Sequence, residues 1–238
     1  MEVDPNLRRL ALTTVEEKKS QPSVGIFITF EGIDGSGKST QADALYYNLH
    51  LQGYALTLTR DPGGALLSEQ IRKLLLDRQY HSMNPVTELL LYEAARSQLI
   101  VEIIRPALDR GEIVLCDRFT DSTLAYQGYG RSIPITLVKD ANRWVCGDTI
   151  PLRTYILDIP WEEFLRRRSI TLTETDRMEK EQQSFYQRVR EGYKTIAREK
   201  SHRVLLLDGT KPIEHLEQEI LQDTLTIIED AQVKKIKL

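Results

Sequence analysis

The strongest chemical signal in this sequence is the run from Gly32 to Ser39, which reads GIDGSGKS. The spacing G-x-x-x-x-G-K-S is that of a loop whose backbone N–H groups enclose a polyphosphate at the positive end of a following helix. In such a loop Lys38 reaches the β- and γ-phosphates, and the hydroxyl of Ser39 holds Mg²⁺. A glycine-rich surface turn is the alternative. The residues expected to bind the nucleotide are Gly32, Asp34, Gly35, Ser36, Gly37, Lys38, Ser39 and Thr40.

The segments around this loop have the patterns that a phosphate site requires. Residues 26–30 form a short apolar run rich in strand formers, and Ala42, Leu45 and Leu49 mark one face of a helix that follows. Strand, loop and helix in this order favour the phosphate-loop interpretation over a surface turn.

Apolar strands alternate with helical patterns along the rest of the chain. Further strands are predicted at 54–59, 113–116, 154–157 and 204–207. Helices are predicted at 67–76, 85–109, 121–129, 135–146, 161–168, 178–199 and 213–228. Asn84-Pro85 is a typical helix start, with Asn as the N-cap. This alternation predicts an α/β fold: a three-layer arrangement in which a five-stranded parallel sheet is flanked by helices, with a small lid.

Polar residues follow three of these strands, and ligands of parallel sheets bind at the carboxyl ends of strands. The phosphate loop follows the first strand, residues 60–64 (RDPGG) follow the second, and Asp117-Arg118 follow the third. Asp117 can orient Mg²⁺ together with Ser39. The alternative for the Asp-Arg pair is a structural ion pair or turn.

Two pairs at helical spacing suggest a pocket for a base. Tyr92 and Arg96 lie four residues apart, as do Thr123 and Gln127. A ring can stack on a base while a guanidinium addresses its edge, and an amide suits the paired N3–H and carbonyl of a pyrimidine. The alternative is that Tyr92 belongs to the core and Arg96 pairs with a glutamate at the surface.

Composition limits the range of functions. The chain has 238 residues, 28% charged, with a formal net charge of −3 and no long basic run, so a nucleic-acid partner is not expected. No apolar run approaches a membrane span, and no secretory or transit pattern is present, so we expect a cytoplasmic location. The two cysteines, Cys116 and Cys146, are expected to be reduced core thiols.

The domain organisation is predicted as a nucleotide-binding domain with a phosphate loop over residues 24–230, between two terminal segments. Residues 1–23 read as a solvated, flexible arm, or alternatively as a short helix that docks through Leu7, Leu10 and Leu12. Residues 231–238 read as a tail. The polar run 169–176 reads as a mobile surface segment within a lid at about 166–178.

The sequence resembles the thymidylate kinase family of nucleoside monophosphate kinases over about residues 24–228. The signatures lie in residues 30–41 (FEGIDGSGKSTQ), 60–64 (RDPGG), 88–96 (ELLLYEAAR), 116–128 (CDRFTDSTLAYQG) and 176–179 (DRME). The family usually has Glu where this chain has Asp61. The resemblance implies ATP and Mg²⁺ as cofactors, dTMP as acceptor, and a homodimer built on helices that include residues 85–109.

The resemblance also implies roles for single residues. Asp34 addresses the sugar 3′-hydroxyl, Tyr92 stacks on thymine, and Arg96 donates to its O4. The other residues implied at the substrate are Asp61, Arg72, Arg118, Thr123, Tyr126 and Gln127; of these, Arg72 and Arg118 grip the acceptor phosphate and Tyr126 crowds the 2′ position. Because the phosphate loop carries Gly35 and Ser36, the catalytic arginine is expected from the lid, as Arg168 or Arg177, with Arg166 a weaker candidate.

These observations predict transfer of the ATP γ-phosphoryl group to dTMP, with Lys38, Arg118 and a lid arginine as catalytic residues. The alternatives are a kinase for dUMP or a deoxynucleoside, an inactive homologue, and a GTP-dependent switch protein. The last fits D-x-x-G at residues 61–64, but the chain contains no N-K-x-D sequence to read guanine.

Overall fold

The computed structural model describes residues 25–170, 177–178 and 181–236. The predicted arm at 1–23 and most of the predicted mobile segment at 169–176 lie outside these residues. Five strands form one parallel sheet in the order β2-β3-β1-β4-β5. Their bounds are β1 Ile26–Glu31, β2 Leu56–Arg60, β3 Ile113–Asp117, β4 Arg153–Asp158 and β5 Val204–Asp208.

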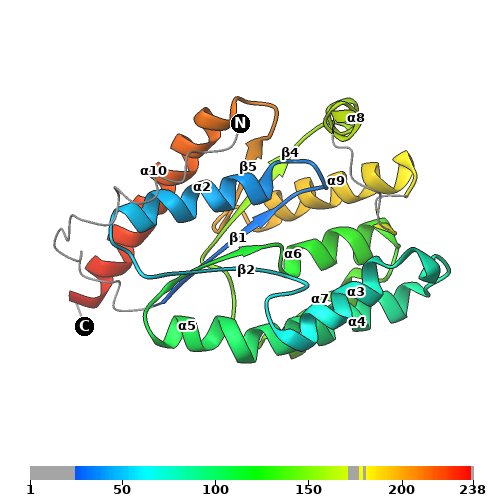
Figure 1. Cartoon of the computed structure of the whole chain (residues 1–238), viewed down its shortest axis with the longest axis horizontal. Helices are drawn as coiled ribbons and strands as arrows, with labels where there is room; N and C mark the ends of the chain where they lie inside the picture. The colour runs from blue at the N-terminus through cyan, green and yellow to red at the C-terminus, as the bar shows by residue number, and fades with distance from the viewer. Residues whose placement is uncertain (1–24, 171–176, 179–180, 237–238) are drawn as a thin grey trace, which may run out of the picture.

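Helices cover both faces of this sheet, which confirms the predicted three-layer α/β fold (Figure 1). On one face, α2 (Lys38–Leu51) and α10 (Ile213–Ile236) pack against alternate residues of β1: Ile26, Ile28 and Phe30. The other face is covered by helices that include α4 (Pro85–Leu99), α5 (Arg105–Asp109), α7 (Ile135–Cys146) and α9 (Gln183–Glu199). Because β1 is buried on both faces, its sequence is continuously apolar up to Thr29.

The remaining helices are α3 (Leu66–Leu76), α6 (Thr120–Thr123) and α8 (Trp161–Ile170), with a 3₁₀ turn at Arg78–Tyr80. The Asn84 side chain accepts a hydrogen bond from the Val86 N–H at 2.9 Å, so the predicted helix start is confirmed. Cys116 and Cys146 are buried and free, as predicted. Within the described ranges, no helix has the length and apolar character to cross a bilayer.

Two predicted helices are interrupted by wider, π-helical stretches. In the predicted helix 85–109 the stretch is Ile100–Ile104. Pro106, which has no N–H for the helix ladder, follows two residues later. In the predicted helix 121–129, α6 gives way to Leu124–Gly130, where Arg131 N–H donates to the Tyr126 carbonyl at 2.8 Å. π-Helical turns occur frequently at functional sites.

The predicted helix 178–199 begins only at Gln183. Just before the predicted helix, the Arg177 N–H donates to the Leu76 carbonyl at 3.1 Å. At the other end of the chain, α10 continues past the predicted residue 228 to Ile236.

Candidate active site

The loop between β1 and α2 has the backbone shape of a phosphate cradle. Gly32, Gly35 and Gly37 have φ values of 137°, 70° and 95°, a region that side chains disfavour. A Cβ at Gly32 would also lie 2.6 Å from the Leu157 carbonyl oxygen. The buried hydroxyl of Ser36 has no hydrogen-bond partner in the described structure. The loop therefore fits a nucleotide polyphosphate, at the N-terminus of α2.

Lys38 begins α2 and is 6% exposed. Its ammonium donates to the Ile33 carbonyl at 3.4 Å and lies 3.7 Å from Oδ1 of Asp34. Burial and the charge of Arg118 lower the pKa of Lys38. A second anion beside this ammonium, such as a phosphate, would favour its charged form.

Ser39 and Asp117 lie together although they are far apart in the sequence. The Ser39 hydroxyl donates to Oδ2 of Asp117 at 2.5 Å, and Oδ1 of Asp117 is buried without a partner in the described structure. A hydroxyl beside a carboxylate oxygen that lacks a donor is a fitting oxygen donor set for Mg²⁺, which in kinases binds one or two protein oxygens and completes its shell with phosphates and water. No group of three or more His, Cys, Asp or Glu residues that could hold a metal occurs among the described residues.

Arg118 connects the phosphate loop with a neighbouring pocket. It follows β3 in a left-handed conformation (φ 70°), which is costly for a residue with a side chain. Its guanidinium donates to the Gly32 carbonyl (3.0 Å), Oδ1 of Asp34 (2.6 Å) and the Tyr126 hydroxyl (3.2 Å). Burial works to raise the pKa of Asp34, but Arg118 and Lys38 hold it well below its ordinary value. The Asp34 carboxyl is therefore ionised at neutral pH.

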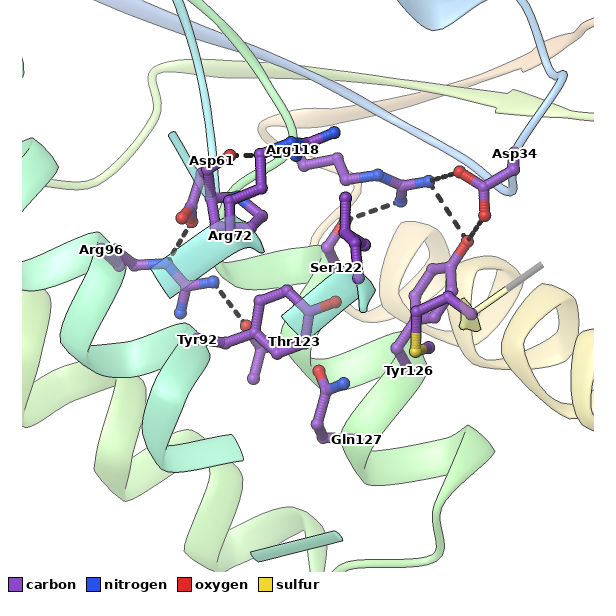
Figure 2. A pocket seen from close by; sticks show the side chains of 13 residues that line it. Asp34, Asp61, Arg72, Tyr92, Arg96, Arg118, Ser122, Thr123, Tyr126 and Gln127 are labelled. Carbon is purple, nitrogen blue, oxygen red and sulfur yellow. Dashed lines mark hydrogen bonds and ion pairs between the residues drawn. The ribbon is translucent and has the colours of Figure 1, made fainter. Parts of the chain in front are cut away.

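The pocket beside Arg118 contains the residues that were predicted to bind the substrate. Figure 2 shows Arg72 from α3, Tyr92 and Arg96 from α4, and Gln127 from the π-helical stretch around one space. Arg72 donates to the Pro62 carbonyl at 3.0 Å. The full lining is Asp34, Asp61, Pro62, Arg72, Leu76, Tyr92, Arg96, Arg118, Ser122, Thr123, Tyr126, Gln127 and Met178.

Arg96 is 1% exposed, so it is not the surface ion pair that the alternative interpretation supposed. Its Nε donates to Asp61 at 2.6 Å, and its Nη1 donates to Glu93 and Asn142, each at 2.7 Å. Its Nη2 donates to Thr123 at 2.5 Å and to the Phe119 carbonyl at 3.3 Å. All five N–H groups are thus engaged within the protein, and a base carbonyl would share one of them.

Several residues of the site were missed by the sequence analysis. Glu31 is fully buried at the end of β1 and accepts hydrogen bonds from Ser122 Oγ (2.5 Å) and Tyr193 Oη (2.9 Å). Both hydroxyls also contact Nη1 of Arg118. A charged residue at the end of an apolar strand was the available signal. Glu31 is a positioning residue for Arg118.

Arg167 is a second residue that the sequence analysis missed. Its Nη1 donates to the carbonyls of Gly35 and Ser36, each at 3.1 Å, and its Nη2 donates to the Gly209 carbonyl at 2.6 Å. Within the RRR run at 166–168, sequence alone could not separate this residue from its neighbours.

The predicted lid arginines lie in different surroundings. Arg166 and Arg167 line the cavity beside the phosphate loop, whereas Arg168 lies over the ring of Phe164 at 5.8 Å. Arg177 is 6% exposed and pairs with Glu88 at 2.6 Å, and the next residue, Met178, lines the pocket beside Arg118.

A family model described as thymidylate kinase matches residues 30–220. The chain belongs to the thymidylate kinase family. A thymidylate kinase of Pseudomonas fluorescens is 45% identical over 208 residues, covering 87% of this chain and 99% of that protein. A thymidylate kinase of an Exiguobacterium species is 40% identical over 211 residues, covering 89% of this chain and 99% of that protein.

A solved structure supports the same assignment. The thymidylate kinase of Ehrlichia chaffeensis is 37% identical, covers 85% of this chain and 99% of its own, and has a TM-score of 0.68. The predicted family and fold are therefore confirmed, and the chain is an ATP-dependent kinase of this family.

The buried Glu31 leads to a prediction for pH dependence. Burial, reinforced by the charge of Asp121, raises the pKa of Glu31 from its ordinary 4.5 to about 7. The folded protein then holds this proton more tightly than the unfolded chain, so the contribution of Glu31 to stability falls as pH rises from about 4.5 to 7. Relative to E31Q, which lacks this titration, the wild type should lose on the order of 3 kcal/mol of unfolding free energy across that range.

Urea denaturation of both proteins at pH 5, 6, 7 and 8 measures this difference. Two stability profiles that remain parallel across the range would contradict the prediction.

Proposed function

We propose that this chain transfers the γ-phosphoryl group of MgATP to dTMP and releases dTDP and ADP, as the names of its relatives imply. The observation that carries the proposal is the position of Arg118, whose guanidinium contacts both Gly32 of the phosphate loop and Asp34 and Tyr126 of the nucleoside pocket. A cation between two anion sites can hold donor and acceptor phosphates within reach of each other.

The reaction needs no general base, because a phosphate monoester with a second pKa near 6 is mostly ionised at neutral pH. The protein must instead align two anions that repel each other and stabilise the charge of a loose transition state. Lys38 and Arg118 supply fixed positive charge for this purpose, and Arg72 is proposed to hold the acceptor phosphate. Ser39 and Asp117 would hold Mg²⁺, which neutralises phosphate charge when bound.

The nucleoside is proposed to lie between Tyr92 and the π-helical stretch. Tyr92 would stack on the base, Arg96 would donate to its O4, and Thr123 and Gln127 would line its edge. Tyr126 would crowd a ribose 2′-hydroxyl, and Asp34 would accept from the 3′-hydroxyl. The pocket lining places these side chains around one space, and Asp61 supports Arg96 within it.

A lid arginine is proposed to complete the charge around the transferred group. Of the two principal candidates, Arg168 lies on α8, next to Arg167, which lines the phosphate-loop cavity. The ion pair of Arg177 with Glu88 gives no support to a phosphoryl contact by that residue. Residues 171–176 of the proposed lid lie outside the described structure.

Single alanine variants should separate these candidates. We expect R168A to lower kcat and kcat/KM together by about tenfold or more, because an arginine engaged only in the transition state acts on both. We expect R177A to lower the thermal midpoint instead, since it removes a partner of the buried Glu88. R166A should change kcat and the thermal midpoint little, because the Arg166 side chain is 62% exposed. Unchanged kcat in all three variants would exclude these three arginines as the catalytic group.

A homodimer is proposed on the surface of α4 and α7. The helical segment from α4 onward exposes Val86, Leu90 and Val101, and α7 exposes Leu137 and Trp144, which is 88% exposed. An apolar surface of this kind is typical of an interface between subunits. We expect L90R to convert a dimer into a monomer in sedimentation velocity, and a wild-type monomer would refute the proposal.

A cytoplasmic location is proposed from the two free, buried thiols.

A coupled assay of ADP release tests the proposed function. We expect turnover with MgATP and dTMP, weaker turnover with dUMP, and little with dCMP or without acceptor, together with a requirement for Mg²⁺. Equal ADP release without acceptor would indicate an NTPase, and preference for GTP would support the switch-protein alternative.

A further inference from the structure

Glu88 is a fully buried carboxylate that forms part of the nucleoside site without lining its cavity. It lies in the first turn of α4, one turn before Tyr92, and is 0% exposed. Its Oε1 accepts from Gln127 Nε2 at 2.8 Å and from Arg131 Nε at 3.1 Å. Its Oε2 accepts from Arg131 Nη2 at 3.1 Å and pairs with Arg177 Nη1 at 2.6 Å. Each oxygen thus has two donors.

This arrangement keeps Glu88 ionised. Burial opposes the charge, but Arg131, Arg177 and the Gln127 amide together hold the pKa of Glu88 below its ordinary value. The N-terminal position in α4 favours a negative charge as well. An ionised carboxylate has no proton to donate, so it can only accept hydrogen bonds.

The charge of Glu88 decides which end of the Gln127 amide points toward it. The NH₂ group must face the carboxylate, because the reverse orientation would set the amide oxygen against a negative charge in a buried site. Gln127 is 2% exposed and lines the nucleoside pocket. In the described part of the chain no donor reaches Oε1 of Gln127, and Figure 2 shows the amide oxygen on the side of Tyr92 and Thr123.

We propose that Glu88 is a positioning residue for base selection: it holds the Gln127 amide so that Oε1 faces the base, and the pocket therefore requires a pyrimidine with a proton on N3. This inference rests on the proposed function, in which the pocket holds a pyrimidine nucleotide.

The consequence for different bases follows from their hydrogen-bonding edges. Thymine and uracil carry N3–H and can donate to Oε1 of Gln127. Cytosine has a lone pair at N3, which would oppose the lone pairs of Oε1 and leave both acceptors unpaired. If Glu88 were neutral and able to donate, the Gln127 amide could rotate and present NH₂ to cytosine. Glu88 thus discriminates against cytosine without touching it.

The test compares E88Q with E181Q in assays with dTMP, dUMP and dCMP. E181Q is a matched control, because Glu181 pairs with the same Arg131 at 2.5 Å and has no contact with Gln127 in the described structure. We expect E88Q to reduce the ratio of kcat/KM for dTMP to kcat/KM for dCMP by about tenfold or more. The change should lie mainly in the nucleotide KM and leave the ATP KM unaltered, and E181Q should retain the wild-type ratio.

A purely structural role for Glu88 predicts another result. E88Q would then lose activity toward dTMP and dCMP in equal proportion, and an unchanged ratio overturns the proposal. The proposed function fails separately: if the wild type does not discriminate between dTMP and dCMP, or does not use dTMP, the pocket assignment is wrong whatever E88Q does.

E88Q leaves Arg131 and Arg177 with less opposing charge and could prevent folding. The double variant E88Q/R131Q, which removes one charge of each sign, is therefore assayed in parallel, with R131Q alone as its control. We expect the ratio of dTMP to dCMP use to fall in the double variant and to persist in R131Q. A folded, active double variant that keeps the wild-type ratio would overturn the role of Glu88.

Discussion

The K38M variant is expected to fold normally and to lose phosphoryl transfer, with a fall in kcat of about a thousandfold or more. Lys38 is the ammonium of the phosphate loop, and a fixed charge at the transferred group contributes several kcal/mol in the transition state. Methionine keeps the length and the buried stem of the side chain. Within the described residues, the contacts of the ammonium with Ile33 (3.4 Å) and Asp34 (3.7 Å) are both long. The fold therefore has little to lose from this substitution.

K211M is a matched control for this experiment. Lys211 lines the same cavity, but it is 35% exposed and pairs with Glu219 at 2.9 Å. We expect K211M to keep kcat within a few-fold of the wild type. Single-turnover assays and thermal denaturation of both variants measure the two effects. Near-normal turnover of a folded K38M would exclude the loop as the catalytic phosphate site.

The elements that the sequence predicted well are those governed by local rules. All five strands were found because continuous apolar runs such as 113–116 are typical of buried parallel strands. The loop at Gly32–Ser39 and the cap at Asn84 were found because their chemistry depends on residues close together in the sequence. The pairing of Ser39 with Asp117 followed from the rule that ligands gather at the carboxyl ends of parallel strands.

The features that sequence analysis missed depend on contacts between distant segments. Arg96 was predicted at the pocket from its spacing to Tyr92, but its enclosure by Asp61, Asn142 and Thr123 from three other segments was not. In the sequence, Glu88 is an acidic residue in the first turn of a helix. Its contact with Gln127 is visible only in the folded structure. Neither helical periodicity nor a motif carries this information, because each contact spans more than 25 residues.

The burial of Arg96 leads to the second prediction with a large expected effect. We expect R96L to lower the free energy of unfolding by about 3–5 kcal/mol, or the thermal midpoint by roughly 10 °C. The substitution removes the cation that faces the buried carboxyls of Asp61 and Glu93, each within 2.7 Å of Arg96. Each of these carboxyls already has one buried oxygen without a partner in the described structure. Leucine can neither pair with these two carboxyls nor donate a hydrogen bond to them.

R143L is a matched control, because Arg143 also pairs with an acid three residues earlier on a helix, at 3.3 Å from Asp140. That side chain is 77% exposed, whereas Arg96 is 1% exposed. An exposed pair of this kind contributes at most about 1 kcal/mol, so R143L should unfold almost as the wild type does. Equal losses of unfolding free energy in R96L and R143L would mean that the buried network around Arg96 does not stabilise the protein.

The pH dependence of R96L distinguishes unpaired charge from simple loss of packing. Burial raises the pKa of both Asp61 and Glu93, and Arg96 opposes that rise in the wild type. Without Arg96 both carboxyls should bind protons more tightly in the folded protein than in the unfolded chain, so the stability of the variant falls as pH rises through their folded pKa values. The deficit of R96L relative to the wild type should therefore be smaller at pH 5 than at pH 8 in urea denaturation. A deficit that is the same at both pH values would show that Arg96 stabilises the fold through packing and neutral hydrogen bonds rather than through its charge.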